Sequence, residues 1–300
     1  MAKSSKLKKK MDAFEWVFYS IIILYVISLF VVLGFGFFNS FKDWYDFDLG
    51  NVLGMPREKY GGFTLQNYSF IITNFRVQVK PLGRPPRYVY IEEMLYNSVA
   101  FSIIVSLFSI ATQVMVSYAC AKYEFKLKGL IYMVAVIVMM VPIVGSLAAE
   151  MQFATELNLK NNFIGIAIMC CKYPGIYFLV FYASFKNISS TYMEAAEIDG
   201  AGHLKIFLQI MLPMVMSSIS AVFVLQFIAN FNNYQTPMLF APERTTVAYG
   251  LFMYQSSVEN GVHTTHKLAA SIATAIPLMI LFFIFRNKIM GNLTMGGIKG

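Results

Sequence analysis

Residues 94–121 read MLYNSVAFSIIVSLFSIATQVMVSYACA, a run of 28 residues without a charged side chain. A helix needs roughly 20 apolar residues to cross a bilayer core about 30 Å thick, so this run is long enough to span a membrane. The rest of the chain has the same character, because 57% of its 300 residues are hydrophobic and only 13% are charged. Soluble domains carry about 25% charged residues. The sequence therefore predicts an all-α integral membrane protein.

Five further apolar stretches bring the predicted number of transmembrane helices to six. They lie at residues 14–38, 129–149, 161–185, within 206–242 with a span that begins near Pro213, and at 268–285. The first stretch follows a basic tail, as the apolar region of a signal peptide does. However, it is 25 residues long and ends in Phe37-Phe38-Asn39-Ser40 rather than in a small-residue cleavage site. We therefore predict an uncleaved anchor helix.

The distribution of Lys and Arg predicts the direction of these spans, because basic residues favour the cytoplasmic side. With a cytoplasmic N-terminus, 13 basic residues lie in inner segments and three, Lys160, Arg244 and Lys267, lie in short outer loops. Seven more lie in the long outer segment, which counts weakly in this rule. Both termini are thus predicted to be cytoplasmic. The predicted organisation is a tail (1–13), an anchor helix (14–38), an extracytoplasmic loop (39–93), a core with five spans (94–286) and a tail (287–300).

The remaining composition excludes several classes of protein. The three cysteines all lie in apolar stretches, where they are predicted to be buried small hydrophobes rather than disulfide partners or zinc ligands. The net charge is +8, but the basic residues cluster beside the apolar spans and not along an aromatic, amphipathic face. No nucleic-acid partner is therefore expected. The histidines lie in loops and predict no metal site.

A loop between the fourth and fifth spans, residues 189–213, reads SSTYMEAAEIDGAGHLKIFLQIMLP. Thr191 followed three residues later by Glu194 predicts a capping box that starts a helix. Asp199-Gly200 predicts its end, since glycine tolerates the left-handed conformation. Apolar residues at helical spacing then predict one face of a second helix, namely Leu204, Phe207, Leu208 and Met211. By periodicity alone, this pattern also fits an ordinary helical hairpin at the membrane surface.

The residue types in this loop narrow the interpretation. Glu194-Ala195-Ala196, followed by Asp199-Gly200-Ala201 and a terminal Leu212-Pro213, resembles the EAA motif of bacterial binding-protein-dependent ABC transporter permeases. The resemblance extends from about Asn97 to the C-terminus. Several stretches are similar to those of carbohydrate-type permeases, which include the maltose permeases: Asn97-Ser98, 118–125, Met140-Val141-Pro142, 230–237 and 294–300. Asn232-Asn233-Tyr234 replaces the usual Trp-Asn-Glu, and the outer loop is unusually long, so the particular substrate stays open.

The resemblance implies a type I ABC importer permease fold with a cytoplasmic EAA coupling helix, in the bacterial cytoplasmic membrane. It implies a second homologous permease subunit, two ABC ATPase subunits and an extracytoplasmic solute-binding protein as partners, and a carbohydrate, expected to be an oligosaccharide, as substrate. ATP and Mg are expected on the ATPases, because this chain has no phosphate-binding loop. No cofactor and no catalytic residue are expected in the chain itself. The ATPase-coupling residues would be Glu194, Ala195, Ala196, Asp199, Gly200, Ala201, Leu212 and Pro213.

Candidates for the substrate path come from polar residues within the apolar spans. Lys172 is an ionisable residue at mid-depth, and such residues are expected to face a cavity or a partner. Next to it lies Tyr173. Near the outer end of the fifth span, amides and an aromatic ring are of the kind that binds sugars, namely Asn230, Asn232, Asn233 and Tyr234. Interfacial anchoring, or pairing of Lys172 with the companion permease, would explain the same residues. Weaker candidates are Gln113, Gln152 and Gln226.

Three other functions were weighed against carbohydrate import. The nearest alternative is an ABC permease for another solute, such as an acidic sugar, a polyol or a glycerol phosphate. An ion-coupled secondary transporter would have two related halves and intramembrane carboxylates, and the sequence has neither. An intramembrane enzyme would need a histidine or a pair of carboxylates within a span, which the predicted spans lack. We also expect a bulky side chain at Ala196 or Gly200 to uncouple hydrolysis from transport.

Overall fold

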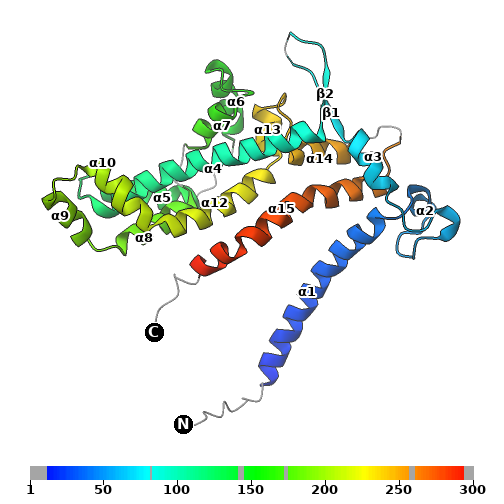
Figure 1. Cartoon of the computed structure of the whole chain (residues 1–300), viewed down its shortest axis with the longest axis horizontal. Helices are drawn as coiled ribbons and strands as arrows, with labels where there is room; N and C mark the ends of the chain where they lie inside the picture. Colours follow the sequence, from blue (N-terminus) through cyan, green and yellow to red (C-terminus); the bar gives the residue numbers. More distant parts are fainter. Residues whose placement is uncertain (1–11, 82, 141–144, 172–174, 257–260, 294–300) are drawn as a thin grey trace. The chain divides into compact units, whose positions relative to one another are not determined.

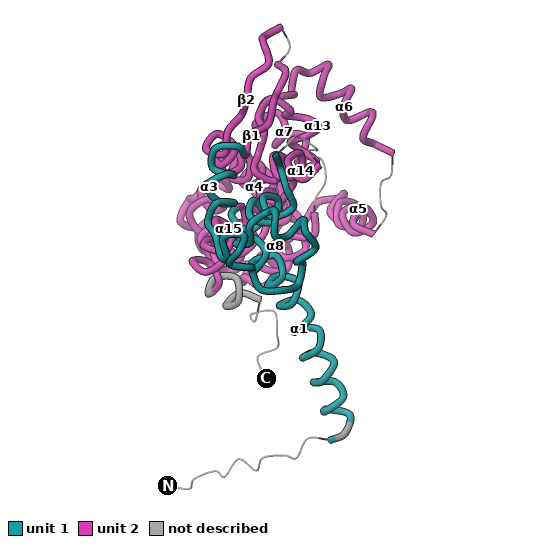
Figure 2. Tube along the Cα trace, turned by 90° about the vertical axis from the view of Figure 1, so that its right-hand side faces the viewer, with its two compact units in different colours: residues 1–74, 258–273 teal, residues 75–257, 274–300 magenta. Residues whose placement is uncertain are grey.

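A computed structural model describes residues 12–81, 83–140, 145–171, 175–256 and 261–293 (Figure 1). Helices dominate, as predicted. The chain divides into two compact units (Figure 2). The first comprises residues 1–74 and 258–273, and the second comprises 75–257 and 274–300. Helix α15 (Thr264–Leu293) begins in the first unit and continues in the second.

In the first unit, the predicted anchor forms one continuous helix, α1 (Ala13–Ser40). Its apolar side chains are exposed over nearly the whole length, from Phe14 to Phe37. Such a helix is hydrophobic all round, which is typical of a membrane span. The outer segment that follows is not a continuous helix, as its prolines and glycines predict. It contains α2 (Trp44–Asp48), a 3-10 turn η1 (Glu58–Tyr60) and α3 (Gln66–Asn74).

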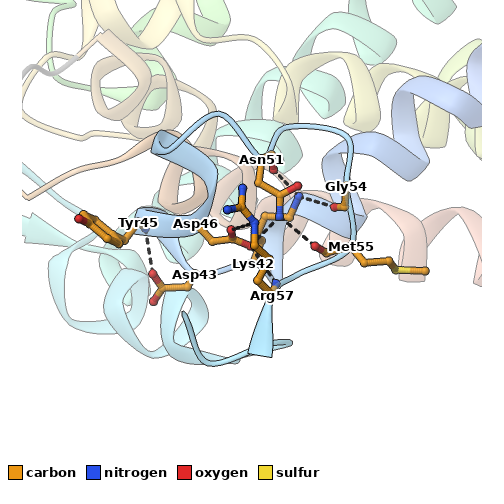
Figure 3. Close-up of polar contacts among 8 residues, drawn as sticks. All are labelled: Lys42, Asp43, Tyr45, Asp46, Asn51, Gly54, Met55 and Arg57. Atoms are coloured by element: carbon orange, nitrogen blue, oxygen red, sulfur yellow. Dashed lines mark hydrogen bonds and ion pairs between the residues drawn. The ribbon is translucent and has the colours of Figure 1, made fainter. Parts of the chain in front are cut away.

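A buried lysine fixes the fold of this outer segment (Figure 3). The Lys42 side chain is fully buried, and its Nζ donates to the carbonyl oxygens of Asn51 at 2.7 Å and Gly54 at 2.8 Å. Burial lowers the pKa of this ammonium group, and the Asp46 carboxylate opposes the shift. Asp46 in turn accepts from the Asn51 amide at 2.8 Å and pairs with Arg57 at 3.1 Å. These bonds close residues 42–57 into one compact loop.

The second unit is built around α4 (Ile91–Lys122), a helix of 32 residues and therefore roughly 48 Å long. It packs against α7 (Phe163–Cys170), α8 (Ile176–Lys186), α12 (Met216–Phe231) and α14 (Val247–Ser256). Small buried serines line its contact faces, as is common between membrane helices. Ser117 Oγ donates to the Phe178 carbonyl at 2.9 Å, and Ser98 Oγ accepts from the Val247 amide at 2.7 Å. An antiparallel hairpin, β1 (Arg76–Val79) and β2 (Arg87–Tyr90), precedes this helix.

Among the residues that the structure describes, three helices are long and apolar enough to cross a membrane: α1, α4 and α15. A fourth crossing would consist of His203–Met214 and Met216–Phe231, which meet at a bend of 73°. The predicted span at 129–149 is not one helix, and the span at 161–185 is interrupted, as the Pro174-Gly175 pair in the sequence predicts. The first region contains α5 (Lys128–Met140) and α6 (Leu147–Glu156), and the second contains α7 and α8. The sequence places a proline between the helices of each pair, Pro142 and Pro174, and proline lacks the amide that continues a helix.

The number of membrane crossings therefore stays a prediction. The helices not yet placed are short: α9 (Thr191–Ile198), α10 (His203–Ile206), the π-helical turn η2 (Phe207–Met211), α11 (Leu212–Met214) and α13 (Gln235–Phe240). Those from α9 to α11 form the EAA loop, beyond the C-terminal end of α4, whereas α13 lies after α12 (Figure 1). The two ends of α4 thus carry different structures, and both bear on function.

Candidate functional site

The EAA helix, α9, begins differently from the prediction. Its N-cap is Ser190, whose side chain makes no capping bond, while Ser189 Oγ accepts from the Thr191 amide at 3.3 Å. The predicted capping box of Thr191 and Glu194 is therefore wrong. Instead, the backbone amide of Glu194 donates to the Ser190 carbonyl at 3.1 Å, and the Ser189 and Thr191 hydroxyls lie 2.8 Å apart. This leaves the Glu194 carboxylate on the exposed face of the helix.

The predicted end of α9 is confirmed. Asp199 is its C-cap, and Gly200 has a φ of 79°, in the left-handed region that favours glycine. Its amide donates to the Glu197 carbonyl at 3.0 Å, and the next amide, of Ala201, donates to the Ala196 carbonyl at 2.9 Å. These bonds satisfy carbonyls that the end of a helix would otherwise leave unpaired. A side chain at position 200 would strain this turn.

The second helix of the loop differs from the prediction in its buried face. Leu204 and Leu208 were expected to share that face, but they are 71% and 49% exposed. Met211 of the predicted face is fully buried, and so is Ile206, which was not predicted to lie on that face. The cause is the π-helical turn η2, because i→i+5 bonding widens the turn and brings residues five apart onto one side. The Leu212-Pro213 pair follows in α11, directly before the 73° bend into α12.

The two adjacent alanines of α9 differ in burial. Ala196 is 7% exposed and lies with Met193 in a cluster that includes Phe181, Phe185 and Ile206. Ala195 points the other way and is exposed. Ile198, at 87% exposure, is an apolar side chain on that outward surface. One face of the helix is therefore anchored in the protein, and the other is free to dock.

The C-terminal end of α4 holds this loop in place. Lys122 Nζ donates to the carbonyl oxygen of Ile188, just before α9. The Tyr118 ring lies 4.8 Å from the ring of Phe207, centroid to centroid, and the Tyr123 ring lies 5.7 Å from the His203 ring. The stretch 118–125, which resembles the end of the second span in carbohydrate-type permeases, thus contacts the EAA loop on both sides of its turn.

A second feature is a hollow of about 290 Å³ between α4, α7, α8 and α12, whose lining is mainly apolar but includes several polar side chains; we call it the polar hollow for these side chains. Its polar lining includes Ser109, Gln113, Gln226 and Asn230. Gln113 Nε2 donates to Ser109 Oγ at 2.8 Å, while its Oε1 is buried and has no hydrogen-bond partner among the described residues. An unpaired buried amide oxygen is unfavourable by about 1–3 kcal/mol unless a ligand or water satisfies it. This hollow can therefore bind a hydroxyl group.

The predicted path residues fall into three groups. Lys172 and Tyr173 lie outside the described residues, as do the Val141-Pro142 and 294–300 stretches. Asn230 lines the hollow, and its Nδ2 donates to Ser106 Oγ at 3.0 Å.

Asn232, Asn233 and Tyr234 do not line the hollow, whereas the weaker candidates Gln113 and Gln226 do. Asn232 donates to the Ile228 carbonyl at 3.1 Å, Asn233 donates to Thr236 Oγ1 at 2.9 Å, and the Tyr234 ring stacks 4.5 Å from that of Phe252. Gln113 and Gln226 therefore deserve more weight than their sequence context suggested. Gln152 is exposed and bonds to Glu156 at 2.8 Å. Ser109 was missed, although it lies four residues before Gln113 on the same helical face.

The sequence profile of a protein family described as "Binding-protein-dependent transport system inner membrane component" matches residues 113–289. The chain belongs to this family. Its match covers the EAA loop and most of the residues that line the polar hollow, from Gln113 onward, and the family is one of transport-system membrane components. Both features described above are thus parts of a membrane permease.

Two curated relatives are similar to this chain in sequence, and one solved structure is similar to it in fold. The arabinooligosaccharides transport system permease protein AraQ of Halalkalibacterium halodurans is 31% identical over 221 residues, covering 71% of this chain and 78% of that protein. The trehalose/maltose transport system permease protein MalG of Thermococcus litoralis is 28% identical over 253 residues, with coverage of 83% and 85%. A bacterial ABC transporter that imports the acidic polysaccharide alginate has a chain with the same fold, with a TM-score of 0.70, 16% identity and coverage of 94% and 99%.

Proposed function

We propose that this chain is a permease subunit of an ABC importer that moves a carbohydrate, an oligosaccharide, across the bacterial cytoplasmic membrane. The observation that carries this proposal is the EAA helix, whose inner face is anchored to α4 and α8 while its outer face stays exposed. The family match supports the class of transporter. The relatives AraQ and MalG, which are named for arabinooligosaccharides and for trehalose and maltose, support the class of substrate.

The energy for transport comes from partner subunits in this proposal. Two ABC ATPases bind ATP and Mg, and this chain contributes no cofactor or catalytic residue. Glu194, Ala195 and Ile198 on the exposed face of α9 contact one ATPase. Movement of that ATPase passes through Met193 and Ala196 to the helices that line the polar hollow, because tightly packed side chains transmit displacement. A bulky substitution in the loop breaks this link.

The remaining parts of the assembly follow from the same proposal. A second homologous permease completes the path, and an extracytoplasmic solute-binding protein delivers the sugar. Both termini of this chain are cytoplasmic, and residues 94–286 form the permease core. Within it, the amides of Gln113, Gln226 and Asn230 offer hydrogen bonds to sugar hydroxyls in the polar hollow.

Co-purification tests this proposal. The chain is tagged, extracted gently from its native membranes, and its companions are identified by mass spectrometry. We expect a second permease and an ABC ATPase in the complex. Ile198→Asp, which places a carboxylate on the exposed face of α9, should release the ATPase but keep the companion permease. Recovery of the wild-type chain alone would contradict the proposed function.

A further inference from the structure

Two hollows open beside the N-terminal end of α4, within the second unit. The first has a volume of about 490 Å³, and its lining includes Arg84, Arg87 and Arg244. The second has a volume of about 440 Å³, and its lining includes Lys80 and Lys160. Both volumes fall in the range of roughly 300–1,000 Å³ that is typical of small-molecule sites. We refer to these two spaces as the outer hollows.

A rigid wall separates the outer hollows. Asn161 and Glu243 line both of them. The Asn161 side-chain amide donates to Glu243 Oε1 at 2.9 Å, and the Glu243 backbone amide donates to Asn161 Oδ1 at 3.1 Å. Asn161 and nearby Asn158 have φ values of 55° and 52°, and within the described residues no other non-glycine residue has a positive φ. Asparagine tolerates this left-handed conformation, so both positions are tight turns beside the wall.

Positive charge in the outer hollows exceeds negative charge. Their lining holds five cations and two carboxylates, Glu93 and Glu243. Glu93 binds Arg87 through two hydrogen bonds of 2.7 and 2.8 Å, and this raises the pKa of the guanidinium. For the other cations, no ion pair with a carboxylate forms in the part of the chain that the structure describes: Lys80, Arg84, Lys160 and Arg244. These four charges are available to a ligand.

The predicted orientation puts ten Lys and Arg residues on the outer side. Lys160 and Arg244 lie in short outer loops, where basic residues are disfavoured. Half of the ten line the outer hollows, although they come from three separate segments of the chain: the β1–β2 hairpin, the loop before α7 and the loop after α13. Their convergence around concave surfaces indicates a binding role.

We propose that the outer hollows bind the acidic groups of a negatively charged oligosaccharide on its way to the membrane path. This inference rests on the proposed function and narrows its substrate to sugars that carry carboxylates. Arginine binds a carboxylate through two parallel hydrogen bonds, and lysine binds it as a point charge. Asn158 and Thr155 in the second hollow offer partners for hydroxyl groups. Two hollows on either side of one wall suit successive residues of one sugar chain.

An acidic surface of the binding protein is the other possible occupant. The concave shape favours a small ligand, because protein docking surfaces are larger and flatter. The test therefore separates the two. The complete importer, with its own binding protein, is reconstituted in phosphatidylcholine liposomes, whose headgroups carry no net charge. Uptake is measured from mixtures of acidic oligosaccharides (hydrolysates of pectate and alginate) and of neutral ones (hydrolysates of arabinan and starch), and mass spectrometry identifies the imported species.

The test uses two double variants that remove the same number of charges. Arg84→Gln with Arg244→Gln alters the first outer hollow, whereas Lys59→Gln with Arg76→Gln alters outer residues that line neither hollow. We expect ATP-dependent import of acidic oligosaccharides. The first variant should raise the KM for the imported sugar about fivefold or more, and the second should leave the KM within about twofold.

Three outcomes would overturn the inference in different ways. If the importer takes up neutral oligosaccharides and neither variant changes their KM, the proposed function stands but the substrate is not acidic. If the sugar-free binding protein binds the Arg84→Gln, Arg244→Gln complex more weakly than the wild-type complex, the outer hollows dock that protein instead. Uptake of neither mixture contradicts the proposed function itself.

Discussion

The two ends of α4 are built from opposite kinds of interaction. At the C-terminal end, Tyr118 and its neighbours join an apolar cluster that fixes the EAA loop. At the N-terminal end, Asn97 and Glu93 line a hollow surrounded by arginines. Apolar packing is dense and transmits movement, whereas exposed charges bind and release a ligand quickly. Helix α4 thus connects the EAA loop, which is held by apolar packing, to a charged hollow. Substitutions and salt should therefore affect its two ends differently.

The largest effect is expected at the turn of the EAA loop. Gly200→Leu places a branched side chain at a φ of 79°, which is unfavourable by roughly 1–2 kcal/mol and displaces α10 relative to α9. We predict that sugar uptake falls more than about tenfold at equal expression. Gly200→Asn is the matched control, because asparagine tolerates this conformation, and it should keep most of the uptake. Unchanged uptake by the leucine variant would show that the turn does not couple the subunits.

The adjacent alanines distinguish anchoring from docking. Ala196→Leu overfills the apolar cluster and should lower the free energy of unfolding by about 1–3 kcal/mol, measured as a lower melting temperature of the purified chain. Ala195→Leu lies on the exposed face and should leave that temperature unchanged while it weakens association with the ATPase. Equal effects of both substitutions on stability would contradict the burial pattern of α9.

The middle of the helix should give an intermediate effect. Gln113→Leu removes the amide whose Oε1 is buried and unpaired in the described structure, together with its bond to Ser109. We predict that the KM for the transported sugar rises about threefold to tenfold, because one hydrogen bond to the substrate is lost. Gln152→Leu, at an exposed position, is the control. An unaltered KM in the Gln113 variant would place the substrate path elsewhere.

Salt should produce the smallest effect, and only at the N-terminal end of α4. Raising the ionic strength from about 0.1 to 1 M shortens the Debye length from roughly 10 to 3 Å. The KM for an acidic sugar should therefore rise by about twofold to fivefold, while association with the ATPase, which relies on apolar contacts, stays constant. Uptake assays and pull-down at matched salt concentrations measure the two quantities. A constant KM together with weaker ATPase association at high salt would contradict the roles assigned to the two ends of α4.

The sequence was sufficient for the features that depend on local chemistry. The uncharged runs predicted α1, α4 and α15, and Asp199-Gly200 predicted the end of α9, because hydropathy and glycine conformation act over short distances. The buried face of the second EAA helix was not predictable, since it depends on the π-helical turn η2. The interruption at 161–185 was predictable from Pro174-Gly175, whereas the count of uncharged residues at 129–149 did not consider the effect of Pro142 on helix continuity.

The candidate sites depended on contacts that sequence spacing does not contain. Asn230 was recognised as a polar residue in a span, but its hydrogen-bond partner Ser106 lies 124 residues away on α4. Asn233 and Tyr234 were equally good candidates by sequence. In the fold, however, Asn233 bonds to Thr236 and the Tyr234 ring stacks on that of Phe252. Arg84 and Arg244 were counted only as exceptions to the charge rule. Their convergence around one hollow required the fold.

The source of energy tests the central claim most directly. The chain and its co-purified partners are reconstituted in liposomes, and uptake of the sugar is measured with ATP inside, and again with an imposed ion gradient but no ATP. We predict uptake that requires ATP, persists after ionophores collapse all gradients, and disappears in the Gly200→Leu variant. Uptake that needs the ion gradient and proceeds without ATP would contradict the assignment as an ABC importer permease and favour a secondary transporter.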